Sequence, residues 1–88
     1  VEGTTYIGGQ EHFYLEGQCA RVIPGENDEI LVIASTQNPS NIQSRVSQAL
    51  RVPRARVVVK AKRLGGGFGG KETRDATASL PAAVAAYK

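Results

Sequence analysis

Short apolar segments separated by turn residues indicate a β-hairpin near the start of the chain. Residues 18–23 (QCARVI) and 29–34 (EILVIA) are each compatible with a strand. Between them lies Pro24-Gly25-Glu26-Asn27-Asp28, a combination typical of a tight loop. A shorter aromatic segment, residues 12–16 (HFYLE), is a further strand candidate, and Gly8-Gly9-Gln10 before it predicts a turn or a close approach of the backbone.

A helix is predicted after the hairpin, because apolar residues recur there with a helical period. Asn38 is a suitable N-cap, and Pro39 suits the first helical position. Pro53 ends the segment, since the residue before a proline is disfavoured in the α region. The predicted apolar face of this helix consists of Ile42, Val46, Ala49 and Leu50.

The second half of the chain predicts a strand, a glycine-rich loop and a helix. Residues 57–64 are a strand candidate, in which Lys60 and Lys62 alternate with Val59 and Ala61 as on a half-buried strand. Residues 73–88 are alanine-rich and helical, and Pro81 either kinks this helix or marks a later start. The order is strand hairpin, helix, strand, glycine-rich loop and helix, which predicts an α+β fold. If strands 29–34 and 57–64 pair in parallel, the loops after both lie at the sheet edge where open sheets bind ligands.

The size of the chain limits it to one small domain. It has 88 residues, of which 41% are hydrophobic and 22% charged, a composition typical of neither disordered nor fibrous proteins. No apolar run reaches the roughly 20 residues that span a bilayer, and residues 1–5 have neither the basic n-region nor the apolar h-region of a signal peptide. Methionine is absent and the helical pattern continues to the last residue. We therefore expect residues 1–88 to be a partial domain, truncated at both ends, of a longer polypeptide.

The net charge of +3 does not predict a nucleic-acid partner. Six of the basic residues lie between positions 51 and 63, where several alternate with apolar residues as on a strand with one solvated side. No aromatic residue is interleaved with them to stack on bases. We expect neither nucleic acid nor a membrane as partner. The single cysteine, Cys19, is expected to be a small buried residue, not a catalytic thiol.

The glycine-rich loop carries the candidate chemistry. Five of the ten glycines lie in the six positions 65–70, which suggests a backbone that closely approaches a ligand. The pattern GxGxxG matches, but a run this dense in glycine meets it almost automatically. The P-loop pattern GxxxxGK[ST] matches except at Glu72, where a carboxylate would repel bound phosphates. One alternative is therefore a standalone α+β module that binds an anion or a nucleotide.

Four blocks of sequence, taken together, carry a more specific signal. They are GGQEHFYLE at residues 8–16, STQN at 35–38, KR at 62–63 and GGGFGGKETR at 65–74. In this order and spacing they resemble the molybdenum-binding region of the xanthine dehydrogenase/xanthine oxidase family of molybdenum hydroxylases. The resemblance extends over essentially the whole chain.

The resemblance implies that the full-length protein is an oxidoreductase that converts hypoxanthine to xanthine and then to urate, with oxygen derived from water. The implied cofactor of this region is molybdenum–molybdopterin. Electrons would leave through 2Fe-2S clusters and FAD, outside this chain, to NAD or oxygen. An aldehyde oxidase of the same family is a further alternative. A homodimer and a cytoplasmic or peroxisomal location are also implied.

Residue by residue, the resemblance assigns three roles. Gln37 matches a glutamine beside the molybdenum, where an amide donates to an oxo ligand without adding charge. Phe68, between Gly67 and Gly69, matches a phenylalanine whose backbone lies against the cofactor. Glu72 matches the carboxylate that binds the purine, which aldehyde oxidases usually lack.

Each of these residues also has a simpler interpretation. Gln37 would be a polar residue before a helix N-cap, Phe68 a core anchor, and Glu72 an acid near a helix N-terminus. No role is assigned to Gln10, Glu11, His12 or Glu16, and Lys71 and Arg74 are expected to support the loop or contact acids elsewhere. The family's catalytic base lies downstream, so no catalytic residue is expected here and the chain alone is not expected to be active.

Overall fold

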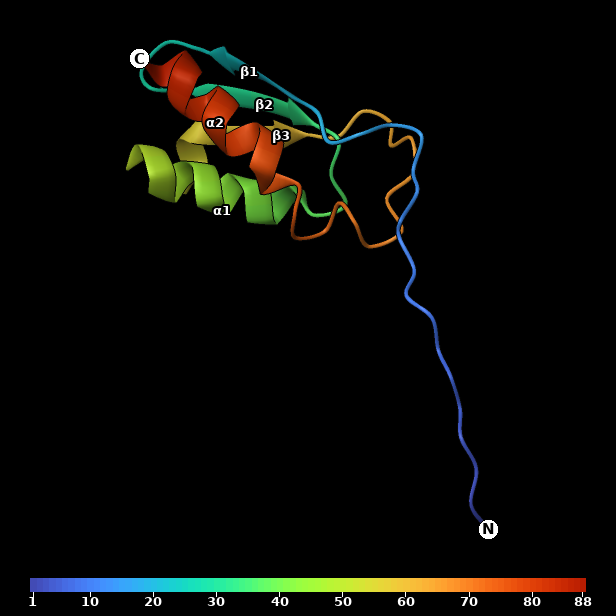
Figure 1. Ribbon diagram of the computed structural model, residues 1–88. Coiled ribbons are helices and arrows are strands. Elements are labelled where there is room, and N and C mark those ends of the chain that lie inside the picture. The colour runs from blue at the N-terminus through green and yellow to red at the C-terminus, as the bar shows by residue number, and fades with distance from the viewer.

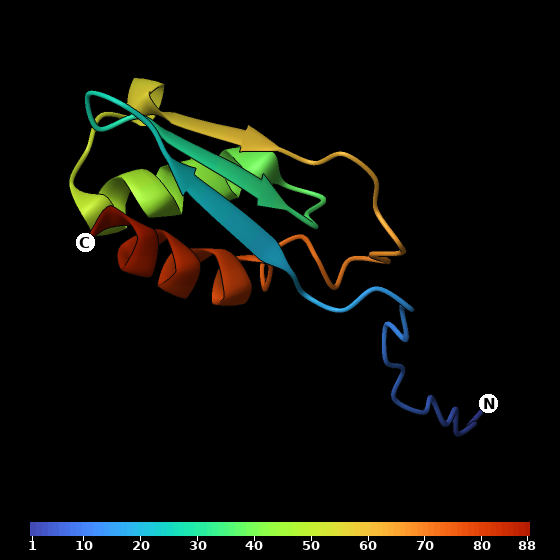
Figure 2. The same cartoon turned by 90° about the horizontal axis from the view of Figure 1, so that it is seen from above.

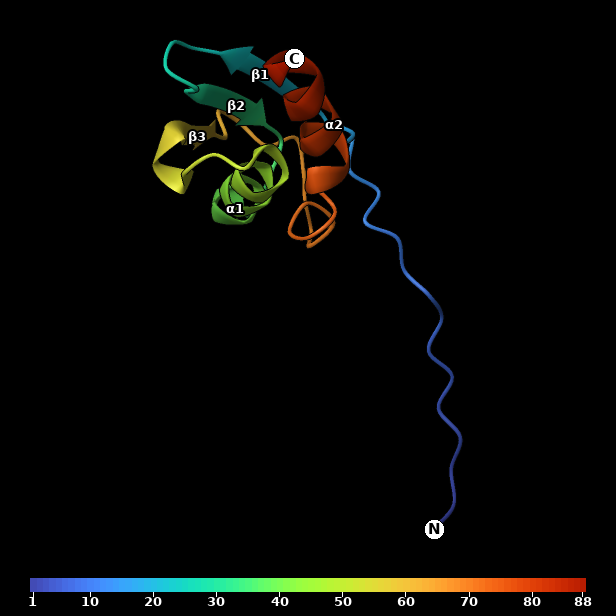
Figure 3. The same cartoon turned by 90° about the vertical axis from the view of Figure 1, so that its left-hand side faces the viewer.

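The computed structural model describes all 88 residues, and it confirms the predicted α+β order (Figure 1). A three-stranded sheet carries two helices on one face, as the end-on view in Figure 3 shows. The elements are β1 (Ala20–Pro24), β2 (Ile30–Ala34), α1 (Pro39–Leu50), a short 3-10 helix (Arg54–Arg56), β3 (Val57–Lys60) and α2 (Ala76–Tyr87).

The sheet combines an antiparallel and a parallel pairing around the central strand β2. β1 runs antiparallel to β2, with Ala20 opposite Ala34, so the predicted hairpin is confirmed. β3 runs parallel to β2, with Ile30 opposite Val57, so the predicted βαβ unit is also confirmed. Both parallel strands therefore end on the same side of the molecule (Figure 2).

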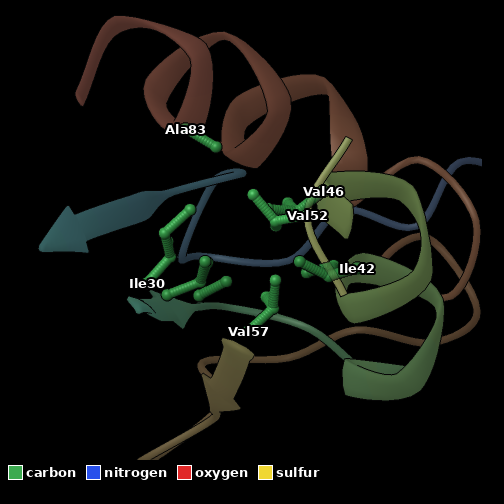
Figure 4. Close-up of a cluster of buried hydrophobic side chains, with 8 residues drawn as sticks. Ile30, Ile42, Val46, Val52, Val57 and Ala83 are labelled. Carbon is green, nitrogen blue, oxygen red and sulfur yellow. The ribbon is translucent and has the colours of Figure 1, made fainter. Parts of the chain in front are cut away.

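The hydrophobic core lies between the sheet and the helices (Figure 4). Alternate residues of β2 face the helices and are buried, and they are Ile30, Val32 and Ala34. Ile42 and Val46 of α1 complete this layer and are fully buried, as the helical period predicted. Helix α2 contributes Ala83, and its small buried residues let it approach α1 and β1 closely.

The ends of α1 follow from local chemistry. The Oδ1 atom of Asn38 accepts a hydrogen bond from the backbone N–H of Asn41 at 3.1 Å, which confirms the predicted N-cap. Pro39 occupies the first turn, as predicted. The helix ends at Leu50, where Arg51 adopts a left-handed conformation with φ +57° and its N–H bonds back to the last turn.

Four local predictions were wrong. Residues 12–16 form no strand, because their backbone has a single partner, the carbonyl of Gly65, instead of a neighbouring strand. β3 ends at Lys60, not at residue 64, because the pairing on β2 stops at Ile33 before the chain leaves the sheet. Helix α2 starts at Ala76, not at residue 73, and continues through Pro81. Cys19 is exposed, because it precedes β1 outside the helix-covered core.

The N-terminal residues 1–11 run away from the folded body and are exposed (Figures 1 and 3). They give the chain its length, with overall dimensions of 66 × 25 × 18 Å. Neither helix is long and apolar enough to cross a membrane.

Candidate cofactor-binding site

Two loops meet beyond the carboxyl ends of the parallel strands. The segment that follows β2 reaches Gln37, and the segment that follows β3 contains the glycine loop, residues 65–70 (Figure 2). The sheet therefore places both predicted site segments at the edge where open sheets bind ligands, as the predicted topology required.

Gln37 is the contact between these two loops. Its backbone N–H donates to the carbonyl of Lys71 at 2.8 Å. Its side-chain Oε1 accepts from the N–H of Gly69 at 2.9 Å and from the N–H of Lys71 at 3.4 Å. A backbone N–H group can only donate a hydrogen bond, so the atom of the Gln37 side-chain amide that faces these two groups must be its oxygen. Nε2 remains a donor that no group of the chain accepts, on an exposed residue.

The glycines of the loop are required mainly by contacts within the chain. A Cβ atom on Gly65 would lie 2.5 Å from Cβ of Glu16, and one on Gly67 would lie 2.5 Å from Oε1 of Gln37. On Gly70 it would lie 2.7 Å from Cε1 of Tyr14. The close backbone approach inferred from the glycine density is thus, at these three positions, an approach to the protein's own side chains.

Gly69 differs from these glycines. The nearest atom to a Cβ added at this position would be Nε2 of His12, at 3.8 Å, so there is space for a side chain. Its backbone φ is +88°, in the region that glycine adopts without strain. Gly69 is therefore needed for its conformation and not for space.

Phe68 lies on the surface of the loop. Its side chain is 73% exposed, so the simpler interpretation of a core anchor is wrong. Its φ is +50°, an uncommon value for a residue other than glycine, and no group of the chain accepts its N–H. Beside the ring lies an open hollow of about 450 Å³, whose other lining residues are Gln10, Glu11 and His12.

Glu72 presents a free carboxylate. The side chain is exposed and forms no ion pair or hydrogen bond within the chain, and only its backbone N–H is used, to the carbonyl of Gly69 at 3.4 Å. Helix α2 begins four residues later, at Ala76, with Asp75 at its N-cap position. Glu72 therefore precedes α2 and does not lie in its first turn, where an acid interacts most favourably with the helix dipole.

Glu16 received no role from the sequence, yet it joins three segments. Its Oε1 accepts from Nζ of Lys71 at 2.9 Å, from the N–H of Gly65 at 3.2 Å and from the hydroxyl of Ser35. The ammonium group of Lys71, with the hydroxyl of Ser35 and the N–H of Gly65, lowers the pKa of Glu16 from 4.5 to about 2. The expected support of the loop by Lys71 is confirmed, and its acidic partner is Glu16.

A second polar contact is buried at the end of the loop. Asp75 is 2% exposed, and one of its carboxylate oxygens accepts a hydrogen bond from the hydroxyl of Thr36. The same hydroxyl oxygen accepts from the N–H of Asn38 at 2.8 Å. This contact holds the residues on both sides of Gln37 against the start of α2. The other oxygen of Asp75 is buried without a partner.

The geometry does not support a P-loop. The side chain of Lys71, which would reach a phosphate in that motif, is 0% exposed and paired with Glu16. The helix does not start at this lysine, since α2 begins at Ala76. A nucleotide bound at this loop would therefore find neither a free lysine nor a helix N-terminus for its phosphates.

The available donors fit a cofactor that carries its own metal ligands. No group of three or more His, Cys, Asp or Glu side chains is arranged to hold a bare metal ion. Two donors without an acceptor are the Nε2 of Gln37 and the N–H of Phe68, and both belong to exposed residues. Uncharged donors of this kind suit the oxo groups of a metal that is already coordinated elsewhere.

Comparisons with known proteins find similar sequences over the whole of this chain. The chain is 54% identical to the xanthine dehydrogenase/oxidase of Mus musculus over 89 residues, which cover 100% of this chain and 7% of that protein. It is 53% identical to the xanthine dehydrogenase of Dictyostelium discoideum and 52% identical to that of Drosophila pseudoobscura pseudoobscura, each over 87 residues, or 99% of this chain and 6% of that protein. The chain thus spans only 6–7% of the length of these relatives.

The resemblance to the xanthine dehydrogenase/xanthine oxidase family is therefore confirmed, and it applies to a small part of such proteins. The model of the molybdopterin cofactor-binding domain matches residues 1–88, the whole chain. The chain belongs to the molybdopterin cofactor-binding domain family.

Proposed function

We propose that this chain is the part of a purine-oxidising molybdenum hydroxylase that positions the metal cofactor and one side of the substrate. The observation that carries the proposal is the contact of Gln37 with the glycine loop. Two backbone N–H groups hold the oxygen of its side chain, which leaves Nε2 without an acceptor in the chain, and the N–H of Phe68 in the same loop has no acceptor either. The 52–54% identity to xanthine dehydrogenases supports purines as the substrate class.

When bound, the molybdenum cofactor supplies the centre that accepts electrons from the substrate. The residues of this chain orient groups around it. Gln37 and the backbone of Phe68, with Gly67 and Gly69 beside it, donate hydrogen bonds without adding charge. Glu72 binds a purine through its free carboxylate, which accepts from ring N–H groups and stabilises positive charge on the ring.

The remaining parts of the proposal lie outside this chain. The full-length protein would pass electrons through 2Fe-2S clusters and FAD to NAD or oxygen, and it would act as a homodimer in the cytoplasm or in peroxisomes. The names of the relatives support an oxidoreductase that acts on xanthine. The catalytic base would come from a segment outside these 88 residues, so the chain alone would be inactive.

The test uses the complete protein that contains this chain. We expect the purified protein to contain molybdenum and to form urate from xanthine. Replacing Glu72 with alanine should lower kcat/KM for xanthine about 10- to 150-fold, the effect of losing a hydrogen bond to a charged group. Molybdenum content should not change, because Glu72 makes no side-chain contact within the chain.

The matched control is Glu26→Ala, which removes an exposed carboxylate in the hairpin loop. Its kinetic constants should equal those of the unmodified protein. Unchanged purine turnover in Glu72→Ala would remove Glu72 from the mechanism. Efficient turnover of aldehydes and none of xanthine by the unmodified protein would assign the chain to an aldehyde oxidase instead.

A further inference from the structure

Residues 12–16 and the glycine loop form what we call the loop end of the molecule. Lys71 has the most deeply buried charged side chain there. It is 0% exposed, whereas the side chain of its partner Glu16 is 37% exposed. The Nζ atom also lies 4.7 Å from the centre of the Tyr14 ring. A buried ammonium group is strongly destabilising without a counter-charge, and Glu16 forms the only ion pair of the chain with it.

The same oxygen of Glu16 ties together three segments that are distant in sequence. Gly65 begins the glycine loop, Lys71 follows its end, and Ser35 stands two residues before Gln37. The backbone N–H of Glu16 adds a fourth contact, to the carbonyl of Gly65 at 3.2 Å. One carboxylate thereby closes the loop at both ends and anchors it to the segment that carries Gln37.

Lys71 is also a direct neighbour of the Gln37 amide. Its carbonyl accepts from the backbone of Gln37 at 2.8 Å, and its N–H donates to the side-chain oxygen of Gln37 at 3.4 Å. A displacement of Lys71 therefore moves the group that fixes the direction of Nε2. The Tyr14 ring adds a steric limit, since its Cε1 lies only 2.7 Å from where a Cβ on Gly70 would be.

We propose that Glu16 and Lys71 are positioning residues for the cofactor site: their ion pair sets the shape of the glycine loop and, through it, the direction in which Gln37 and Phe68 present their donors. Neither residue contacts the reacting atoms in this arrangement. The inference rests on the proposed function for its effect on catalysis, but its effect on the loop is independent of that function.

The experiment uses the complete protein with four variants. Glu16→Gln keeps an acceptor for Ser35 and Gly65 but removes the counter-charge of Lys71. Lys71→Met removes the ammonium group, and Lys71→Arg retains a cation as a conservative replacement. The double variant Glu16→Gln/Lys71→Met has no uncompensated buried charge and no ion pair. The controls are Glu26→Gln and Lys60→Met, which alter exposed residues without ion pairs.

The first readout is hydrogen exchange of the amides of residues 65–71, which reports the loop whether or not the protein is an enzyme. We expect faster exchange in both single variants and in the double variant, with the amides of β2 unchanged, and unchanged exchange in the controls. Unchanged exchange of the loop amides in Lys71→Met would overturn the proposal.

The second readout separates positioning from folding stability. In molybdenum-loaded protein, Lys71→Met should lower kcat by about 100-fold, the effect of misplacing a catalytic group by roughly 1 Å, and should alter the EPR spectrum of the reduced metal. The double variant should regain the unfolding temperature of the unmodified protein but not its kcat or spectrum, and Lys71→Arg should recover part of both. A double variant with normal kcat and spectrum would show a purely structural role and overturn the proposal.

The two proposals fail in distinguishable ways. If the unmodified protein contains no molybdenum and forms no urate, the proposed function fails, while the exchange data still decide whether the ion pair shapes the loop. If the unmodified protein is active and every variant matches it, the positioning role fails and the proposed function stands.

Discussion

The helix-covered core and the loop end of this molecule differ in which side chains they bury: the core buries apolar residues, and the loop end buries polar ones. In the core, alternate apolar residues of β2 face the helices, and Val32 is fully buried. In residues 12–16 the alternation is inverted. Phe13 and Leu15 are 93% and 99% exposed, while His12, Tyr14 and Glu16 are partly buried on the side of the glycine loop.

The difference follows from what each surface has to contact. The core brings together apolar side chains, so burial of hydrocarbon suffices and many apolar residues would serve. The loop consists mostly of glycines and offers backbone amides and carbonyls, which need donors and acceptors in defined directions. The core therefore supplies stability, and the glycine loop with the residues around it supplies hydrogen-bonding groups in defined directions.

The largest effect is expected from a deletion in the core. Ile42→Ala removes a fully buried side chain between α1 and β2 and should cost about 2–5 kcal/mol. The control Leu15→Ala removes a 99% exposed side chain and should change stability by less than about 0.5 kcal/mol. Hydrogen exchange of the β2 amides in the complete protein measures the stability change of each variant. Equal losses of stability in the two variants would mean that residues 12–16 are packed as strongly as the core.

A smaller and more local effect is expected from added methyl groups in the glycine loop. Gly70→Ala places a Cβ 2.7 Å from Tyr14 and 2.8 Å from His12, so the loop must move, at a cost of about 1–3 kcal/mol. Gly69→Ala meets no atom closer than 3.8 Å and should cost only about 1–2 kcal/mol of backbone strain at φ +88°.

The two glycine variants also distinguish a glycine that is needed because there is no room for a side chain, Gly70, from one that is needed for its backbone conformation, Gly69. Gly70→Ala should displace the loop away from Tyr14 and speed exchange over residues 65–71, whereas Gly69→Ala should leave the loop against Tyr14. The β2 amides should keep their protection in both. Faster hydrogen exchange of the β2 amides in Gly70→Ala would show that the loop and the core unfold together, and that they are not separate regions.

Sequence patterns predicted the core well because its rules are periodic. The helical period of α1 and the cap at Asn38 each follow from one segment and needed no knowledge of the others, whereas the buried and half-buried alternation along the uniformly apolar β2 emerged only with the structure. The parallel pairing of β2 and β3 followed from chain order. The error in the length of β3 lies at an element end, where strand pairing stops with the partner strand and not at a change in composition.

The loop end was predicted less completely, for a physical reason. The density of glycines revealed a close backbone approach, but not that Glu16, Tyr14 and Gln37 are what the backbone approaches. The contact of Glu16 with Lys71 spans 55 residues and has no periodic signal. The predicted parallel pairing already placed the segment of Gln37 and the glycine loop at one sheet edge, but only the resemblance to one family brought residues 8–16 to the same site.

The smallest predicted effect concerns how the two regions respond to acid. The folded pKa of Glu16, about 2, lies below its ordinary value of 4.5, because Lys71, Ser35 and Gly65 donate to the charged form. Its contribution to stability is therefore complete above pH 4.5, declines as the pH falls, and is lost below about pH 2. Core residues such as Ile42 do not titrate, so the hydrogen exchange protection of the β2 amides should not change over this pH range.

In the 88-residue chain labelled at its glutamate carboxyl carbons, NMR should give a titration midpoint near pH 2 for Glu16, and Glu16→Gln should remove that signal and the acid dependence of the loop. A midpoint near 4.5 for Glu16, while the signals of β2 remain those of the folded sheet, would show that the ion pair with Lys71 does not form in solution.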